Sequence, residues 1–345
     1  MFYFAYESSD LFAMPTANSI YSLLKNIKCE DVEIFIISKD FSKANFNIIK
    51  NMIAKIPNIN VKLTRVELPD LSKTYGFHIF DYGGKWNVDS FGKLILCDLL
   101  PKYVDKVLYL DSDTLVMQDI SGLMEMNLDG KMFGAVMDFI SSDYFSLLGL
   151  NSDKGIYCNT GMILENLTLC REFNIATRIN KYLDQTNGVV FFSEQSVFNV
   201  VFQDEIKVLP LAYNLTTIPA SLTWKQIKML RNPHNSYTCE EINESLKNPF
   251  IIHFTSFFLI KNRPWINNCN HPFTKDYLNS FNESAIKFLL WNDNRRFKKK
   301  MIDFCMSLLP TGFVCWLVGK YYSKGRINKF KNLSRGNNHV CTKKY

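Results

Sequence analysis

Short apolar segments alternate with helix-length segments through the first third of the chain, and this alternation restricts the fold more than any other feature. Four segments have the apolar or alternating pattern of strands: 1–6, 32–37, 60–66 and 106–110. Segments 16–27 and 42–55 between them have the spacing and length of helices. Strands that alternate with helices predict a mainly parallel α/β sheet covered on both faces. In such sheets, ligands bind beyond the carboxyl ends of the strands.

The later part of the chain gives a less regular pattern. We predict strands in the apolar stretches 157–165 and 250–254, and helices at 170–184 and 193–203. We expect residues 220–248 to be rich in loops.

Length and composition favour one main domain followed by a tail. The chain has 345 residues, 47% of them hydrophobic, and no linker rich in Pro, Gly and Ser divides it. The opening MFYFAYESSDLF lacks the basic and apolar regions of a signal peptide, and no apolar run of membrane-spanning length is present. The nine cysteines include no CxxC pair, so we expect reduced thiols in a cytoplasmic protein.

The net charge of +7 is concentrated at one end of the chain. Residues 292–345 hold 13 of the 40 Lys and Arg residues and two of the 33 acidic residues, a local balance of +11. The remaining residues therefore hold 27 basic and 31 acidic side chains, a balance of −4. The body of the protein is slightly acidic, which argues against nucleic acid as a partner.

Two carboxylates follow the strand-like segment at 106–110. In VLYLDSDTLV, Asp111 and Asp113 are separated only by Ser112, so on extended chain both would point to one side. A turn at the end of a strand would explain them, because Asp and Ser favour turns. A divalent cation would also explain them, because it relieves their repulsion, and their oxygens suit Mg²⁺ or Mn²⁺.

A histidine near the far end of the sequence is a candidate third ligand. His253 lies in the apolar segment FIIHF, where a histidine is most often a core residue, but an imidazole would favour Mn²⁺ at a mixed site. Phosphatases with an aspartate nucleophile also place D-x-D after a strand. They require Thr or Val at the fifth position, which is Leu115 here, while Thr114 stands one place early.

Six segments in order resemble glycosyltransferase family 8, a family of retaining enzymes that includes bacterial lipopolysaccharide galactosyl- and glucosyltransferases. The resemblance extends over roughly residues 1–270. The matching segments are FYFAYESSDLF with SIYSLL, SFGKLILCDLLPKYVDKVLYLDSDTLV, FGAVMD, YCNTGMILENL, SEQSVFNVVF and IIHF with RPW. The resemblance implies a GT-A fold: a single Rossmann-like domain over 1–290 with a mixed, mainly parallel sheet. Its nucleotide-binding half would be about 1–115, and its acceptor and sugar half about 116–290.

The resemblance also implies a cation and a nucleotide-sugar donor. Asp111, Asp113 and His253 would hold Mn²⁺ or Mg²⁺, and the donor would be UDP-glucose or UDP-galactose. A cation that bridges the two phosphates stabilises the charge that develops on the leaving diphosphate. Arg263 stands where the family has a diphosphate-binding Lys, with Lys261 as the alternative. Lys93 stands where the family has an Arg and keeps its charge without the planar guanidinium.

Other positions match the family's sugar and nucleotide contacts. Asp138, Glu194 and Gln195 would be catalytic and, together with Asn159, would bind the donor sugar. The nucleotide contacts implied by the resemblance are Ala5 and Tyr6 through their backbone, Asp10, Phe12 and Ser112. The chain departs from the family at Leu11, where relatives often have Asn, and at Ser196, where many have a second acid. Without an acid at 196, we expect same-face transfer in which Gln195 supports the cation-like sugar, not a double displacement.

The basic tail, 291–345, surrounds an apolar and aromatic segment. Residues 301–318 are interrupted by Asp303, Pro310 and Gly312, which favours a segment on an anionic membrane surface over one that spans the membrane. Packing of this segment on the body is the alternative. We therefore predict a Mn²⁺-dependent hexosyltransferase, peripheral on the inner face of the cytoplasmic membrane, that acts on lipopolysaccharide core or a related surface glycan. A metal-dependent phosphatase or nucleotidyltransferase, or an inactive membrane-binding relative, remains as the alternative.

Overall fold

A mixed, mainly parallel sheet forms the centre of the protein in the computed structural model, which describes residues 1–80, 87–150, 155–233, 235–287 and 289–328. Among these residues seven strands form it in the order β3-β2-β1-β4-β7-β6-β8. Only β7 runs antiparallel to its neighbours β4 and β6. The predicted sheet is therefore confirmed. Its strands are β1 (Phe2–Glu7), β2 (Asp31–Ser38), β3 (Asn60–Glu67), β4 (Lys106–Leu110), β6 (Phe133–Met137), β7 (Cys158–Asn166) and β8 (Ile206–Leu209).

Strand alternation divides the core between the two faces of this sheet. In β1, Phe4 and Tyr6 enter the hydrophobic cluster on one face, whereas Ala5 enters the cluster on the other. The first cluster also takes residues of α1 (Ala13–Asn26), α2 (Lys43–Ile53) and α13 (Thr274–Glu283). The second takes residues of α3 (Leu71–Tyr75), α4 (Leu96–Leu99), α7 (Leu167–Glu172), α8 (Ile175–Gln185) and α9 (Ser193–Val201). The sheet is thus covered on both sides.

A small second sheet joins distant parts of the sequence. Its order is β5-β10-β9, formed by β5 (Thr114–Val116), β10 (Ile251–His253) and β9 (Leu215–Thr216). In the antiparallel pair of β10 and β5, His253 lies opposite Thr114. Because Thr114 directly follows Asp113, this register carries His253 to the carboxylate pair across 140 positions of sequence.

The prediction of a loop-rich segment at 220–248 is wrong. Two helices, α11 (Trp224–Arg231) and α12 (Cys239–Lys247), occupy most of it, after the short α10 (Thr217–Ser221). Each of the two begins with a capping box, Thr223 with Gln226 and Thr238 with Glu241, which is the signal that the sequence offered.

The single helix predicted at 170–184 is interrupted by an asparagine. Asn174 has φ of +45° and caps α8 through the backbone N–H of Thr177, so α7 and α8 are separate helices. Asparagine tolerates this left-handed conformation better than most residues. Two further short helices come before and after β6 in the sequence: α5 (Ser121–Glu125) and α6 (Phe145–Leu148).

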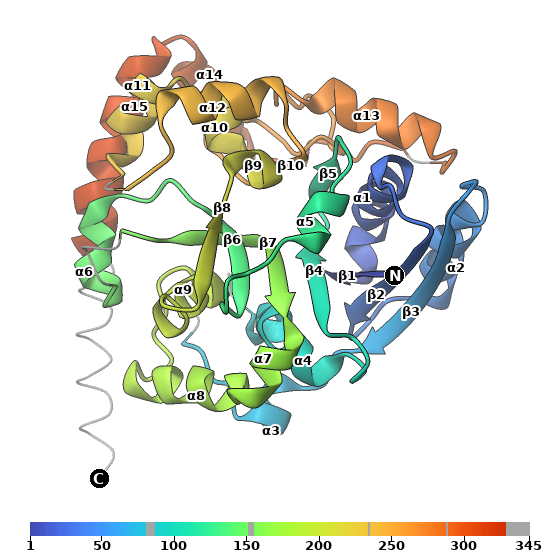
Figure 1. The fold of residues 1–345 in the computed structure, drawn as a ribbon. Helices are drawn as coiled ribbons and strands as arrows, with labels where there is room; N and C mark the ends of the chain where they lie inside the picture. The colour runs from blue at the N-terminus through green and yellow to red at the C-terminus, as the bar shows by residue number, and fades with distance from the viewer. Residues whose placement is uncertain (81–86, 151–154, 234, 288, 329–345) are drawn as a thin grey trace.

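The C-terminal part is helical and packs partly on the body (Figure 1). It contains α14 (Phe297–Ser307), α15 (Thr311–Lys320) and a π-helical turn at Tyr321–Gly325. α15 crosses α11 closely: a Cβ on Gly319 would lie 2.3 Å from the carbonyl oxygen of Met229. Beyond it, the backbone carbonyl of Tyr322 accepts a 2.6 Å hydrogen bond from the Tyr144 hydroxyl. None of the helices in the described part of the chain combines the length and apolarity needed to cross a bilayer.

Candidate active site

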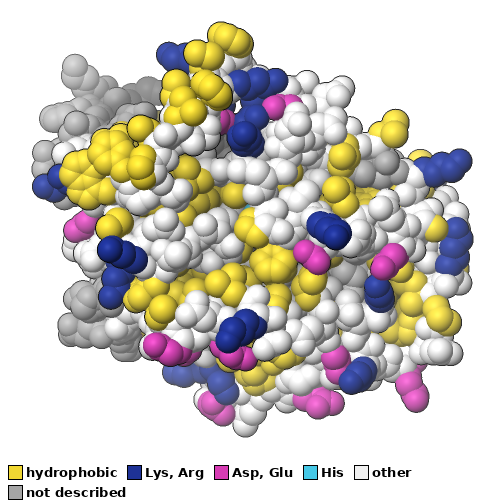
Figure 2. Space-filling view, turned by 90° about the horizontal axis from the view of Figure 1, so that it is seen from above, with side chains coloured by type: hydrophobic (Ala, Val, Ile, Leu, Met, Phe, Trp, Pro, Cys, Tyr) yellow, Lys and Arg dark blue, Asp and Glu magenta, His cyan; other side chains and the backbone are white. Residues whose placement is uncertain are grey.

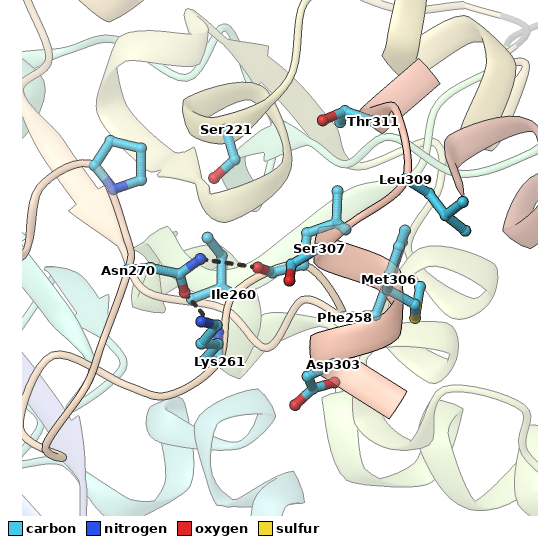
Figure 3. A pocket seen from close by; sticks show the side chains of 12 residues that line it. Ser221, Phe258, Ile260, Lys261, Asn270, Asp303, Met306, Ser307, Leu309 and Thr311 are labelled. Carbon is cyan, nitrogen blue, oxygen red and sulfur yellow. Dashed lines mark hydrogen bonds between the residues drawn. The ribbon is translucent and has the colours of Figure 1, made fainter. Parts of the chain in front are cut away.

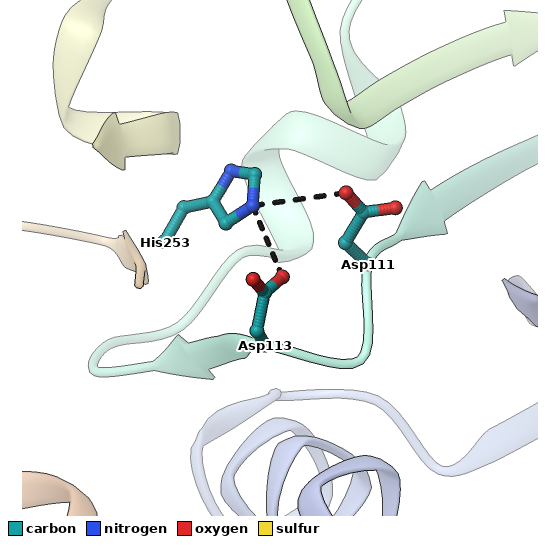
Figure 4. Close-up of side chains that lie close together, drawn as sticks. All are labelled: Asp111, Asp113 and His253. Carbon is teal, nitrogen blue, oxygen red and sulfur yellow. Dashed lines mark ion pairs between the residues drawn. The ribbon is translucent and has the colours of Figure 1, made fainter. Parts of the chain in front are cut away.

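The predicted metal triad forms where the two sheets meet (Figure 4). Asp111 follows the end of β4 and its backbone N–H donates to the Gly161 carbonyl at 2.8 Å. Nε2 of His253 lies 3.1 Å from Oδ1 of Asp113 and 3.7 Å from Oδ2 of Asp111. One potential ligand atom from each of the three residues lies within 4.8 Å of the others. Two carboxylate oxygens and one imidazole nitrogen form a donor set that fits Mn²⁺ or Mg²⁺.

The histidine ring occupies a fixed position in this site. Its Nδ1 lies 3.1 Å from Oδ1 of Asn214, which leaves Nε2 directed at the carboxylates. The ring packs directly over Gly161, where a Cβ would lie 1.9 Å from Cε1 of His253. Only a residue without a side chain leaves room for the imidazole, and this close approach explains glycine at position 161.

Two basic side chains, Lys93 and Arg263, flank the metal triad. Nζ of Lys93 lies 2.7 Å from Oδ1 of Asp111, and Nη1 of Arg263 lies 2.6 Å from Oδ2 of Asp113. Burial tends to raise the pKa of Asp113, but His253 and Arg263 outweigh it and hold that pKa below the ordinary value. Burial likewise disfavours the charge on Lys93, but the surrounding acids raise its pKa overall. The two carboxylates therefore face positively charged side chains on both sides, an arrangement suited to a diphosphate.

The four residues predicted at the donor sugar also come together. Nε2 of Gln195 donates to Oδ2 of Asp138 at 3.2 Å, and Nδ2 of Asn159 donates to Oε1 of Gln195 at 3.1 Å. Glu194 lies on the other side, with Oε1 at 3.8 Å from Nζ of Lys93. The structure thus connects these residues, drawn from the end of β6, from β7 and from α9, with the cationic side of the metal triad.

The first turn of α9 is strained and turns position 196 inward. Ser193 has φ of +52° and is fully buried, a conformation that costs about 1–3 kcal/mol in a residue other than glycine. Ser196 is also fully buried, and its hydroxyl lies 3.3 Å from the Tyr157 hydroxyl and accepts from the backbone N–H of Phe192. The residue that replaces the second acid of the family pattern therefore has partners within the core.

The residues predicted at the nucleotide loop make contacts within the protein. Oδ1 of Asp10 accepts from the Ser42 backbone N–H and from Nδ2 of Asn45, both at 2.8 Å. These hydrogen bonds, that from the Ser42 backbone first, hold the pKa of Asp10 below its ordinary value. Asp10 thereby joins its 3₁₀ turn, Asp10–Phe12, to the start of α2.

The other residues predicted to contact the nucleotide lie in β1 or near its carboxyl end. Ser112 is at that end, where its hydroxyl donates to the Glu7 carbonyl at 3.4 Å. The Phe12 ring packs edge-on against two tryptophans, Trp265 and Trp291, with centroids 6.0 and 6.1 Å away. Ala5 and Tyr6 are fully buried as whole residues, backbone included, between β2 and β4. The Ser112 hydroxyl accepts from Thr16 at 2.8 Å, within the protein.

Three residues at the site were not singled out in the sequence. Oε2 of Glu7 accepts from the backbone N–H of Lys93 at 3.1 Å, and the Tyr109 hydroxyl donates to Oδ1 of Asp111 at 2.8 Å. Burial raises the pKa of Glu7 to about 8, against the opposing effect of Lys93. Asn214 holds His253, as described above. Glu7 could have been found, because parallel strands β1 and β4 end at the same edge of the sheet.

Lys261, the alternative to Arg263, lies at a different place. It lines a cavity of about 360 Å³ between the 258–272 loop and α14, together with Asn270, Asp303 and Ser307 (Figure 3). Its backbone N–H donates to Oδ1 of Asn270 at 2.7 Å. Of the two candidates, Arg263 is the one that contacts the metal triad.

Sequence comparison places the chain in a family. The model of glycosyl transferase family 8 matches residues 4–269, which is most of the chain. The chain belongs to glycosyl transferase family 8. This family 8 protein is 24% identical over 260 residues to glycosyltransferase GlyF of Streptococcus pneumoniae and 25% identical over 321 residues to lipopolysaccharide 1,2-glucosyltransferase of Escherichia coli K12. The alignments cover 75% and 89% of the family 8 chain described here, but 56% of GlyF and 87% of the glucosyltransferase.

Solved structures agree with this family on the fold. The galactosyltransferase LgtC, in complex with donor and acceptor sugar analogues, matches with a TM-score of 0.67 at 16% identity. The match covers 83% of the family 8 chain and 97% of LgtC. The predicted GT-A fold is therefore confirmed, and the protein is a member of a glycosyltransferase enzyme family.

Proposed function

We propose that this protein is a retaining hexosyltransferase that uses a UDP-sugar and Mn²⁺. The proposal depends on the triad of Asp111, Asp113 and His253. This triad lies between two basic side chains, those of Lys93 and Arg263. Because a diphosphate carries several negative charges, it needs both a cation and basic side chains around it. Mg²⁺ would fit the same oxygens, but the imidazole favours Mn²⁺.

The chain's own residues suit transfer of a glycosyl group with retention. Bound Mn²⁺ would act as a Lewis acid on the diphosphate leaving group. Arg263 and Lys93 would orient the diphosphate, and the ribose and base would lie toward Asp10, Phe12 and Ser112. Asp138, Asn159 and Glu194 would accept or donate hydrogen bonds to sugar hydroxyls.

Gln195 is the group that we propose supports the anomeric centre. Its side chain carries no charge and lies between Asp138 and Asn159, where it would support the cation-like sugar. Position 196 is a serine, buried against Tyr157, so it offers no carboxylate for a double displacement. We therefore propose same-face transfer, in which the leaving phosphate takes the proton of the acceptor hydroxyl. Product NMR showing an inverted anomeric centre would contradict it.

The proposed acceptor is a hydroxyl of lipopolysaccharide core or a related surface glycan. The similarity to lipopolysaccharide 1,2-glucosyltransferase of E. coli K12 supports this choice, because the alignment covers 89% of the chain. Glucose and galactose are both proposed as the transferred sugar. The geometry of Thr114 argues against the phosphatase alternative: its hydroxyl donates to the Asp111 carbonyl at 2.8 Å and is fully buried.

The proposal includes docking of the tail, 291–345, on an anionic membrane, which would place the protein on the inner face of the cytoplasmic membrane. Part of the tail packs on the body, yet α14, α15 and the residues between them expose nine large apolar side chains. These are Phe297, Met301, Ile302, Phe304, Leu308, Leu309, Phe313, Trp316 and Leu317. Hydrophobic side chains gather beside Lys and Arg on the left of Figure 2, where these helices lie. Apolar groups flanked by basic ones suit an interface with anionic lipid.

Release of UDP from a panel of UDP-sugars, with and without Mn²⁺, tests the proposal. We expect one sugar to be turned over only with Mn²⁺, and Asp113→Ala to abolish the reaction. Asp184→Ala is the matched control, since its side chain is 73% exposed on α8. If no UDP-sugar is turned over and none raises the melting temperature of the wild type, the protein is not a UDP-sugar transferase. Lipid binding without donor binding would then favour an inactive membrane-binding relative.

A further inference from the structure

A continuous chain of hydrogen bonds connects the proposed sugar site with the metal triad. It starts at Asp138 and passes through Gln195 and Asn159 as described above. Nδ2 of Asn214 then donates to Oδ1 of Asn159 at 2.9 Å, and Oδ1 of Asn214 lies 3.1 Å from Nδ1 of His253. Asn214 is completely buried, at the end of the 3₁₀ turn Leu211–Asn214 that precedes β9.

Backbone donors fix the direction of every bond in this chain. The N–H of Gly161 donates to Oδ1 of Asn159 at 2.9 Å, and the N–H of Thr160 donates to Oε1 of Gln195 at 3.4 Å. A backbone N–H can only donate, so these two oxygens are acceptors and the amide orientations follow. Oδ1 of Asn159 can receive only a donor from Asn214, which must therefore turn its own oxygen toward His253.

The tautomer of the histidine follows from this orientation. An amide oxygen cannot donate, so Nδ1 of His253 carries the proton and donates it to Asn214. Nε2, which lies 3.1 Å from Oδ1 of Asp113, is then the ring nitrogen that would give up its proton and bind a cation at Asp111 and Asp113. Metal-binding histidines commonly have such a partner on the second nitrogen, which fixes the ring and its tautomer.

We propose that Asn214 is a positioning residue that fixes His253 as a metal ligand and joins it to the side chains proposed at the sugar. The proposal rests on the cation site of the proposed function. It does not depend on which sugar or acceptor is used. Asn214 hydrogen-bonds to His253 and Asn159 and would act through these two residues.

Two substitutions at this position separate its roles. Asn214→Leu keeps a similar size but removes the acceptor for Nδ1. We expect Mn²⁺ affinity to fall about 10–100-fold, the effect typical of losing a partner of a metal-binding histidine. Asn214→Asp keeps an acceptor for Nδ1 but cannot donate to Oδ1 of Asn159, so we expect it to bind Mn²⁺ clearly more tightly than Asn214→Leu while breaking the link to Asn159. This rescue would not occur if Asn214 only filled space. Asn18→Leu is the control, because Asn18 is equally buried and hydrogen-bonded, but to α13.

Calorimetric titration of the metal-free full chain with MnCl₂ gives these affinities without an activity assay. NMR of histidine-¹⁵N-labelled protein with Mg²⁺, which is diamagnetic, gives the tautomer, with His253→Gln used to assign the signal. We expect protonated Nδ1 in the wild type and its loss in Asn214→Leu. An unchanged affinity in Asn214→Leu, or a protonated Nε2 in the Mg²⁺-loaded wild type, would overturn the proposal. Failure of the wild type to bind either metal would instead overturn the cation site itself.

Discussion

Replacement of Gly161 by alanine is the sharpest test of the metal site. An added Cβ would lie 1.9 Å from Cε1 of His253, where ordinary contacts begin at 3.4 Å, so the ring would have to move by about 1.5 Å. The backbone of β7 cannot give way easily, because this strand pairs with β4 and β6 and the Gly161 carbonyl holds Asp111. Metal–ligand distances usually lie within about 0.2 Å of their standard values, so the ring movement required here would break the bond. We therefore expect the alanine variant to lose His253 as a ligand.

The expected magnitude is at least a tenfold weaker affinity for Mn²⁺, or about 1.4 kcal/mol. Overpacking should lower the free energy of unfolding by a further ~1–3 kcal/mol. Calorimetric titration with MnCl₂ measures the affinity, and denaturation without metal measures the stability. Gly122→Ala is the matched control, because a Cβ there meets nothing within 4 Å. Wild-type affinity in Gly161→Ala would refute the assignment of His253 to the cation.

Two further predictions concern stability and membrane contact. Burial, with Arg263 nearby, lowers the pKa of His271 from 6.5 to about 4. Between these values the unfolded chain binds more protons, so the free energy of unfolding should fall as pH decreases, by up to ~1.4 kcal/mol per unit. Urea denaturation of His271→Gln should show a shallower fall; an identical slope would contradict this. The wild type should co-sediment with vesicles that contain 30% phosphatidylglycerol. A smaller fraction of the double variant Phe313→Ser, Trp316→Ser should sediment with them. Phe173→Ser is the control, because Phe173 is also an exposed aromatic residue. Equal sedimentation of all three would exclude this face.

Local patterns were sufficient for most of the central sheet. The segments predicted as strands at 32–37, 60–66 and 106–110 lie within β2, β3 and β4, because short apolar or alternating runs favour strands. The same reasoning placed Asp111 and Asp113 at a ligand-binding edge. It failed over 220–248, where polar surface residues concealed two short helices whose capping boxes were the available signal.

The sequence by itself determined the alternation of strands and helices, the acids that end β4, and the family resemblance. Tertiary structure decided which side chains contact those acids. His253 reaches them only because β10 pairs with β5, and Arg263 only because the loop after β10 returns to Asp113. Asn214 and Gly161 are ordinary residues in the sequence; their importance comes from a buried contact with one imidazole ring. Spacing along a chain records local geometry, whereas contacts between distant segments depend on how the whole core packs.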